Sequence, residues 1–572
     1  MKVFKVTVYV VVATLLLVFT FAALSPEDRP VYSRPVEFPI TMCGSWSVSD
    51  PYWTSPVVLS DGLGDLHYSI TTNNPLAQKY FDQGLRLVYG FNHVEALRSF
   101  REASRLDPSS AMTYWGQALT LGPNINDWNP KDREAMAHEA ILKAKQLSPG
   151  STQKEQDFIL AMASRYDGRS YDNRDPLNTA YRQAMEQLTV KYPSDPEALV
   201  LYADAIMTSV PWDYWNNDGS PKSSTIQARK ALETAIRKYP KHPGAHHMYI
   251  HLVEASNSPA DAHNSAEFLE TAMPAAGHIV HMPSHIYVRT GEYDRANISN
   301  TNAVRVDEDF LAQTNDQGLY RAGYYPHNID FLVYGSLMNG QSAQAVSEGN
   351  KLAYHIMSLK TLMPTYYDYF LATPIVSYVR YGQWNQVLAL HPPDEQYYQV
   401  SATHHFARGL AFLRKGNVSD ARVELTKLDS ITKLDTLKTI YAFFNSTQQI
   451  ASVAVNLLRG EVLAHEKKTE ESIVALREAM KAEDDLRYNE PPDWRLPVRH
   501  FLGAVLFEAG RYAEAEKVYQ DDLVKNAGNG WSLQGLAMCQ EKLGKGKEAE
   551  ATRSNLSKAW KNADTKITSS RF

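Results

Sequence analysis

Four histidines of this 572-residue chain recur at an interval of 34 residues, and that interval is the strongest constraint on its fold. Eight of the eighteen histidines lie between His242 and His285. One repeated pair is His247 and His281, and the other is His251 and His285. An interval of this length is typical of helix-turn-helix units that stack on one another. The spacing therefore predicts that each pair occupies equivalent positions on two neighbouring, parallel helices.

The repeat register can be found without the histidines. Alternating small and large residues, followed by a proline, mark the second helix of one unit: Ala228, Leu232, Ala235 and Pro240. The pattern returns one repeat later, after a turn glycine: Gly291, Tyr293, Ala296 and Ala303. In this register the units begin at Pro243 and Gly277, and each histidine pair takes the same place in its unit. Because residues four apart on a helix share one face, we expect the four imidazoles to converge.

This spacing resembles that of the tetratricopeptide-repeat superfamily. Residues 84–108 and 503–549 fit the same pattern, and weaker copies fill most of 76–560. Irregular insertions interrupt the repeats near 120–175, 208–225, 305–325 and 430–450. No alternation typical of strands competes with the helical periodicity, so the predicted fold is an all-α helical solenoid. In this superfamily the first helices of the units line a concave groove. The resemblance therefore implies that the histidines lie in that groove.

The sequence predicts four segments. We expect a signal peptide or signal-anchor over residues 1–24, an extended tether over 25–75, a solenoid over 76–560 with the histidine-rich repeats at 243–330, and a C-terminal tail over 561–572.

The N-terminal segment determines the expected location. Lys2 and Lys5 precede an uncharged run from Val6 to Leu24, which is long enough to cross a bilayer at about 1.5 Å per residue. A cleaved signal peptide and an uncleaved anchor both fit this run, and both export the remainder. We therefore expect an extracytoplasmic protein that is either membrane-anchored or secreted.

Composition excludes several classes of function. The formal net charge of −6 argues against a nucleic-acid partner, which normally requires a basic excess. There is no phosphate-binding glycine loop and no dinucleotide fingerprint. With two cysteines in the chain, a cysteine-based zinc or iron-sulfur site is excluded by count.

The histidines instead predict a metal site built from imidazoles. Two histidines at i and i+4 on a helix can hold one ion together, and two such pairs would lie on adjacent helices. Further candidate donors are His278, His327 and Glu254. This set suits either one ion with supporting histidines or a pair of ions about 3.5 to 4 Å apart. An all-histidine set in an exported protein favours copper or zinc, whereas Glu254 as a ligand would extend the choice to iron or manganese.

Aromatic residues near the histidines predict the walls of a substrate pocket. The insertion at 211–219 contains Trp212 and Trp215 and directly precedes the repeat that leads into the histidine helices. Tyr287, and the pair Tyr324 and Tyr325 just before His327, are expected to complete the same wall.

Three longer motifs resemble a group of exported bacterial-type tetratricopeptide proteins. They are HPGAHHMYIHLVEAS at 242–256, AGHIVHMPSHIYVRTGEY at 276–293 and YYPHN at 324–328. The resemblance implies that the histidine cluster is a shared feature, but it supplies no reaction.

Two functions follow from these observations. The first is a metal-dependent enzyme for oxidation or hydrolysis of a small organic substrate, with the histidines as ligands and Glu254 as a ligand or a general base on metal-bound water. The second is a non-catalytic scaffold whose groove binds a peptide or a protein partner. Within these alternatives, the paired histidines are metal ligands, helix-packing residues copied by duplication, or the lining of a groove that binds an acidic or peptide ligand without metal.

Overall fold

The computed structural model describes residues 56–572, apart from 217–218, 315–317, 319, 359, 361–363 and 395. All described residues fall within one compact unit. The run from Val6 to Leu24 and the first part of the expected tether, 25–55, lie outside the described residues. None of the described helices is long and apolar enough to cross a membrane. Export through the N-terminal run therefore stays a prediction.

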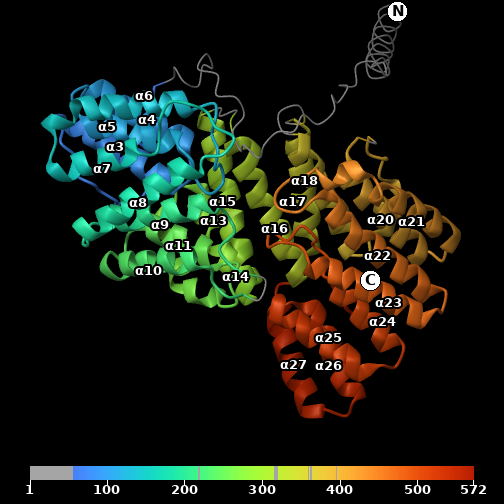
Figure 1. The fold of residues 1–572 in the computed structure, drawn as a ribbon. Helices are drawn as coiled ribbons and strands as arrows, with labels where there is room; N and C mark the ends of the chain where they lie inside the picture. Colours follow the sequence, from blue (N-terminus) through green and yellow to red (C-terminus); the bar gives the residue numbers. More distant parts are fainter. Residues whose placement is uncertain are drawn as a thin grey trace, which may run out of the picture. The chain divides into compact units, whose positions relative to one another are not determined.

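The described chain is a succession of α-helices (Figure 1). The first half contains α3 (Pro75–Tyr89), α4 (His93–Leu106), α5 (Ala111–Leu121), α6 (Glu134–Leu147), α7 (Gln153–Ala163), α8 (Asp175–Lys191), α9 (Pro196–Ser209), α10 (Ser223–Lys238), α11 (Pro243–Val253), α12 (His263–Ala272), α13 (Gly277–His281), α14 (Pro283–Thr290) and α15 (Tyr293–Thr314). The second half contains α16 (Tyr325–Asn339), α17 (Ser342–Met357), α18 (Pro364–Arg380), α19 (Trp384–Ala389), α20 (Tyr398–Arg414), α21 (Val418–Thr432), α22 (Thr447–His465), α23 (Thr469–Asp484), α24 (Val498–Glu508), α25 (Tyr512–Lys525), α26 (Gly530–Lys542) and α27 (Gly546–Ala559). Short turns of helix are η2 (Ser148–Gly150), η3 (Pro259–Ala262), η4 (Tyr320–Tyr324) and η5 (Asp435–Lys438). Among the described residues, β contacts are limited to isolated bridges.

Local sequence signals fix several helix ends. The Asn74 side chain accepts hydrogen bonds from the first turn of α3, and Thr152 with Glu155 forms a capping box on α7. Gly291 and Gly340 end α14 and α16 in the left-handed conformation, at φ values of 83° and 80°. A side chain at these positions would be strained, so the turn glycines of the repeat pattern have a conformational cause.

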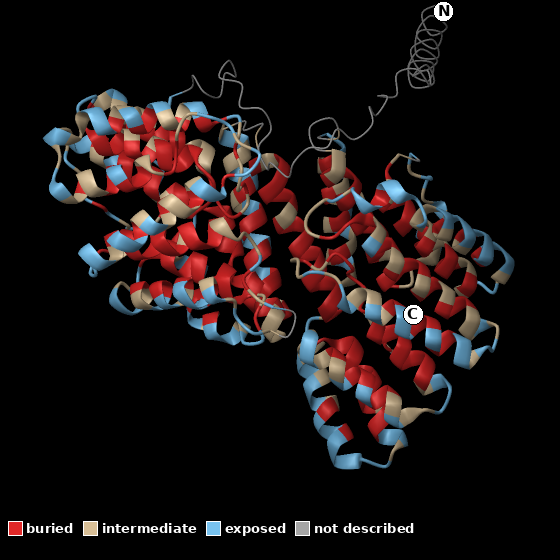
Figure 2. Ribbon diagram, viewed as in Figure 1, coloured by how far each residue is buried: buried red, intermediate tan, exposed pale blue. Residues whose placement is uncertain are grey.

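Successive helices pack against one another, as a solenoid of helix-turn-helix units requires. Examples are α3 on α4, α9 on α10, α15 on α16, α22 on α23 and α26 on α27. Buried positions lie on the sides of the helices that face their neighbours, and exposed positions lie on the outer sides (Figure 2). The predicted all-α, tetratricopeptide-type solenoid is confirmed.

Both ends of the described chain pack on the helices. Residues 56–74, part of the expected tether, contain no helix, yet Leu63 and Tyr68 are buried. In the expected C-terminal tail, Ser570 is fully buried and lies 2.7 Å from the hydroxyl of Tyr519. The tail therefore belongs to the packed body.

Candidate metal centre

Two proline-initiated helices bring the repeated histidines together. Helices α11 and α14 begin with Pro243 and Pro283 and contact each other. Proline suits the first helical turn because its missing N–H would have no partner there. Pro283 also separates α13 from α14, so the second histidine-bearing segment is two short helices where the repeat pattern suggested one.

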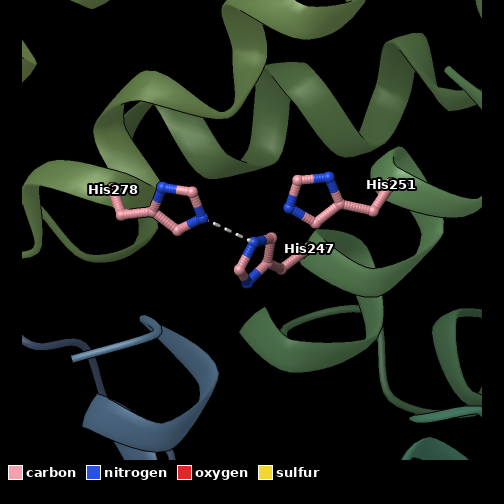
Figure 3. Close-up of side chains that lie close together, drawn as sticks. All are labelled: His247, His251 and His278. Atoms are coloured by element: carbon pink, nitrogen blue, oxygen red, sulfur yellow. Dashed lines mark hydrogen bonds between the residues drawn. The ribbon is translucent and has the colours of Figure 1, made fainter. Parts of the chain in front are cut away.

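The first triad consists of His247 and His251 from α11 and His278 from α13 (Figure 3). Its three candidate ligand atoms lie within 4.8 Å of one another. The Nε2 atoms of His247 and His278 are 3.2 Å apart. His251 Nε2 is buried and has no hydrogen-bond partner among the described residues. The rings point toward a common centre, as metal ligands do.

The second triad consists of His281 from α13, His285 from α14 and His327 from α16. His281 Nε2 lies 2.8 Å from His285 Nε2 and 3.2 Å from His327 Nε2. The two triads are adjacent, since the rings of His251 and His285 are 5.3 Å apart. The predicted convergence of the four repeated histidines is confirmed, and both additional histidines join them.

Hydrogen bonds on the outer ring nitrogens orient the imidazoles. His247 Nδ1 donates to the Tyr89 carbonyl at 2.6 Å, which can only accept. His281 Nδ1 donates to Asn300 Oδ1 at 2.6 Å, and the Asn300 amide nitrogen donates to a backbone carbonyl. With Nδ1 carrying the proton, the Nε2 lone pair of each neutral ring points to the centre. This arrangement is typical of metal-binding histidines.

Glu254 connects the two triads from behind. Its Oε1 accepts from His251 Nδ1 at 2.9 Å, and its Oε2 accepts from His285 Nδ1. The carboxylate is fully buried and does not line the cavity described below. Glu254 was predicted as a ligand or a general base, and its position instead suits a residue that orients two ligands. His251, Glu254 and His285 also form a group whose candidate ligand atoms lie within 4.8 Å of one another.

Burial keeps most of the rings neutral. It lowers the pKa of five histidines well below 6.5, and the neighbouring imidazoles lower it further for each: His247, His251, His278, His281 and His327. His285 is the exception. Burial alone would lower its pKa, but the charges of Glu254 and Glu490 outweigh this and raise it to about 10.

The cluster is buried, which corrects the expectation of an open groove. His247 and His281 are fully buried, and Phe91 from the turn between α3 and α4 covers the first triad. The Phe91 ring stacks at 5.3 Å from His278 and 5.8 Å from His251. Helix α3 packs on α11 and brings this turn inward. Groove-facing positions thus become interior positions because another unit closes over them.

A cavity of about 80 Å³ borders both triads. Four ligand candidates line it: His251, His278, His285 and His327. The remaining wall is mostly aromatic: Trp128, Trp212, Tyr324, Tyr366, Phe443, Phe444 and Tyr488. Such a wall, with a few convergent polar groups, is typical of a small-molecule site.

The predicted aromatic wall forms in part. Trp212 lines the cavity, with its ring 5.2 Å from that of His251, and Tyr324 lines it as well. Trp215 donates to the Leu252 carbonyl at 2.7 Å, outside the cavity.

The two other predicted wall residues face away from the cavity. Tyr287 donates to Glu270 at 2.7 Å, and Tyr325 donates to Glu308 at 2.9 Å. Each is two residues from a clustered histidine on a helix, which turns its side chain to the opposite face. That part of the wall is therefore corrected.

The sequence did not single out Glu490. This residue lies between α23 and α24, and its Oε2 is 2.6 Å from His285 Nδ1. Burial and the charge of Glu254 raise the pKa of Glu490 to about 8, although His285 opposes the shift. Its side chain is 5% exposed and borders the cavity. No repeat relation connects it to the histidines, so periodicity gave no signal for it.

Comparison with known proteins adds little beyond the architecture. No family model matches the sequence, and no curated protein matches it. Among solved structures, a human IFIT1 dimer with m7Gppp-AAAA has a TM-score of 0.33 and 14% identity, covering 87% of this chain and 92% of that one. The APC/C hetero-tetramer Cut9-Hcn1 has a TM-score of 0.30 and 12% identity, covering 85% of this chain and 88% of that one. The TPR domain of P58(IPK) has a TM-score of 0.21 and 11% identity, covering 82% of this chain and 99% of that one. The chain has a tetratricopeptide-type fold. That assignment rests on its own helix pairing, because the superpositions are loose.

Proposed function

We propose that the protein is a metal-dependent enzyme that holds a pair of ions in its two histidine triads and acts on a small organic substrate. The adjacent cavity is the substrate site in this proposal. Tetratricopeptide-type surfaces also suit a protein partner, and such a partner would not need the buried histidines.

The observation that carries the proposal is the direction of the six rings. Hydrogen-bond acceptors hold the outer nitrogens of four of them, so that their inner nitrogens face the centre. Buried polar atoms without a partner cost about 1 to 3 kcal/mol each. His251 Nε2 and His278 Nδ1 are such atoms. An ion in the first triad would give His251 Nε2 a partner.

The donor set narrows the choice of metal. Three imidazoles for each ion suit copper or zinc, and iron is the next choice. His285 would have to release a proton when the second ion binds. Copper or iron would supply oxidation chemistry, and zinc would supply an activated hydroxide for hydrolysis. The protein's own residues would orient the ligands through Glu254 and exclude water through the aromatic wall.

Metal stoichiometry tests the proposal. The full chain, stripped with a chelator and reconstituted separately with copper, zinc and ferrous iron, is expected to retain two ions per chain of at least one metal. His247→Ala and His327→Ala each remove one ligand from a different triad, so each should retain one ion. Elemental analysis by mass spectrometry measures this.

His246→Ala is the matched control. His246 neighbours His247 on α11 and is buried, but it bonds to Ser265 and the Pro240 carbonyl outside the cluster. This variant should keep both ions. A folded wild-type protein that retains none of the three metals would refute the proposal, and so would unchanged stoichiometry in both triad variants.

A further inference from the structure

The cavity beside the triads has the size of a single ring. Its volume is about 80 Å³. One water requires roughly 10 to 15 Å³ of cavity volume, so the cavity accommodates roughly five to eight non-hydrogen atoms. A substituted single ring fits this space, whereas a peptide or an oligosaccharide does not.

The walls contain two close pairs of aromatic rings. Phe443 stacks on Tyr366 at 5.0 Å between ring centres, and the rings of Trp212 and Phe444 are 5.9 Å apart. Aromatic rings attract one another in stacked and edge-to-face arrangements beyond the gain from burial alone. These walls therefore favour a planar aromatic guest over a puckered aliphatic one of the same size.

The acidic and basic groups at the cavity wall contact each other. The described residues that line the cavity include no lysine or arginine, but they include Glu490 and His285, whose Oε2 and Nδ1 are 2.6 Å apart. A neutral guest leaves this pair intact.

Two unsatisfied polar atoms mark where a guest would hydrogen-bond. Glu490 Oε1 and the Tyr488 hydroxyl are buried at the cavity wall and have no hydrogen-bond partner among the described residues. A guest with a hydroxyl group would donate to the Glu490 oxygen. Because Glu490 Oε2 is 2.6 Å from His285, that hydroxyl would then lie at the histidine end of the cavity.

We infer that the substrate is a small, uncharged aromatic alcohol of the phenol class, a conclusion that rests on the proposed function. Its ring lies against Trp212 and Phe444, and its hydroxyl faces Glu490 and the triads. The aromatic wall selects planarity, the unpartnered Glu490 Oε1 selects a hydroxyl group, and the contact between Glu490 and His285 favours a neutral guest.

Binding of phenol to the full chain tests this inference. Calorimetric titrations compare phenol with three probes, each lacking one feature: cyclohexanol is not planar, toluene has no hydroxyl, and benzoate is charged. We expect phenol to bind at least tenfold more tightly than each of the three. Equal binding of cyclohexanol, or preference for benzoate, would overturn the inference.

Substitutions locate the site. Phe444→Leu should weaken phenol binding by roughly 2 to 13-fold, the range expected for one lost aromatic contact. Phe507→Leu is the matched control, because Phe507 is similarly half-buried and contacts Tyr512 outside the cavity. Equal effects of the two substitutions would also overturn the inference.

Metal content, measured on the same samples, separates the two proposals. Protein that holds two ions but does not prefer phenol contradicts the substrate class alone. Protein that binds phenol but holds no metal contradicts the proposed function, and with it the reading of phenol as a substrate.

Discussion

Replacing Glu254 with glutamine is expected to lower the affinity of the protein for one of the two metal ions and to leave its affinity for the other unchanged. The carboxylate accepts a hydrogen bond from His251 at one oxygen and from His285 at the other. Glutamine keeps one acceptor and turns an NH₂ group toward the other ring. That ring must move its proton to Nε2 or rotate, and its inner lone pair is then lost. Loss of such a supporting partner typically costs roughly 10 to 100-fold in metal affinity.

Competition with a chromogenic chelator measures this effect. Glu254→Ala removes both hydrogen-bond acceptors, so it should lower the affinity for both ions. Asp522→Asn is the control. Asp522 on α25 is a buried carboxylate whose Oδ2 lies 3.0 Å from His500 Nε2 on α24, and both residues lie apart from the histidine cluster. If Glu254→Gln binds both ions as tightly as the wild type, Glu254 does not orient the ligands.

Replacing His285 with alanine is expected to destabilise the metal-free protein by about 3 to 5 kcal/mol. Its Nδ1 lies against two buried carboxylates, those of Glu254 and Glu490. Removing the imidazole leaves both carboxylates without this partner in the interior, which is the costly way to break a buried ion pair.

His327→Ala is the comparison, because the contact of His327 Nε2 in the cluster is with His281 and not with a carboxylate. It should change the stability of the metal-free protein by far less. A solenoid of this length need not unfold in one step, so hydrogen exchange of the α11 and α14 amides is the appropriate measurement. Equal loss of protection in the two variants would show that the carboxylate contacts of His285 are not stabilising.

The repeat interval predicted the core of the site because helix geometry is periodic. His247 and His251 lie on successive turns of α11, and His281 and His285 occupy the equivalent positions one repeat later. Stacking of the units places equivalent positions side by side. His278 and His327 followed from the same register. The helices themselves were predictable from spacing, small residues and turn glycines.

What the sequence did not reveal depends on contacts between distant units. Phe91 reaches the cluster because α3 packs on α11, and Glu490 reaches it from the segment before α24. Neither position repeats with the histidines, so no periodic signal marks it. The error at Tyr287 had a different origin. Proximity in sequence to His285 suggested a shared wall, but two residues along a helix reverse the direction of a side chain.

The most direct test of the metal centre is the X-ray absorption spectrum of the reconstituted full chain. The proposal predicts nitrogen ligands at about 2.0 to 2.1 Å for zinc, with the outer-shell scattering of about three imidazoles per ion and a metal neighbour at about 3.5 to 4 Å. A spectrum with mainly oxygen ligands and no imidazole scattering would contradict the central claim that the two histidine triads hold the metal.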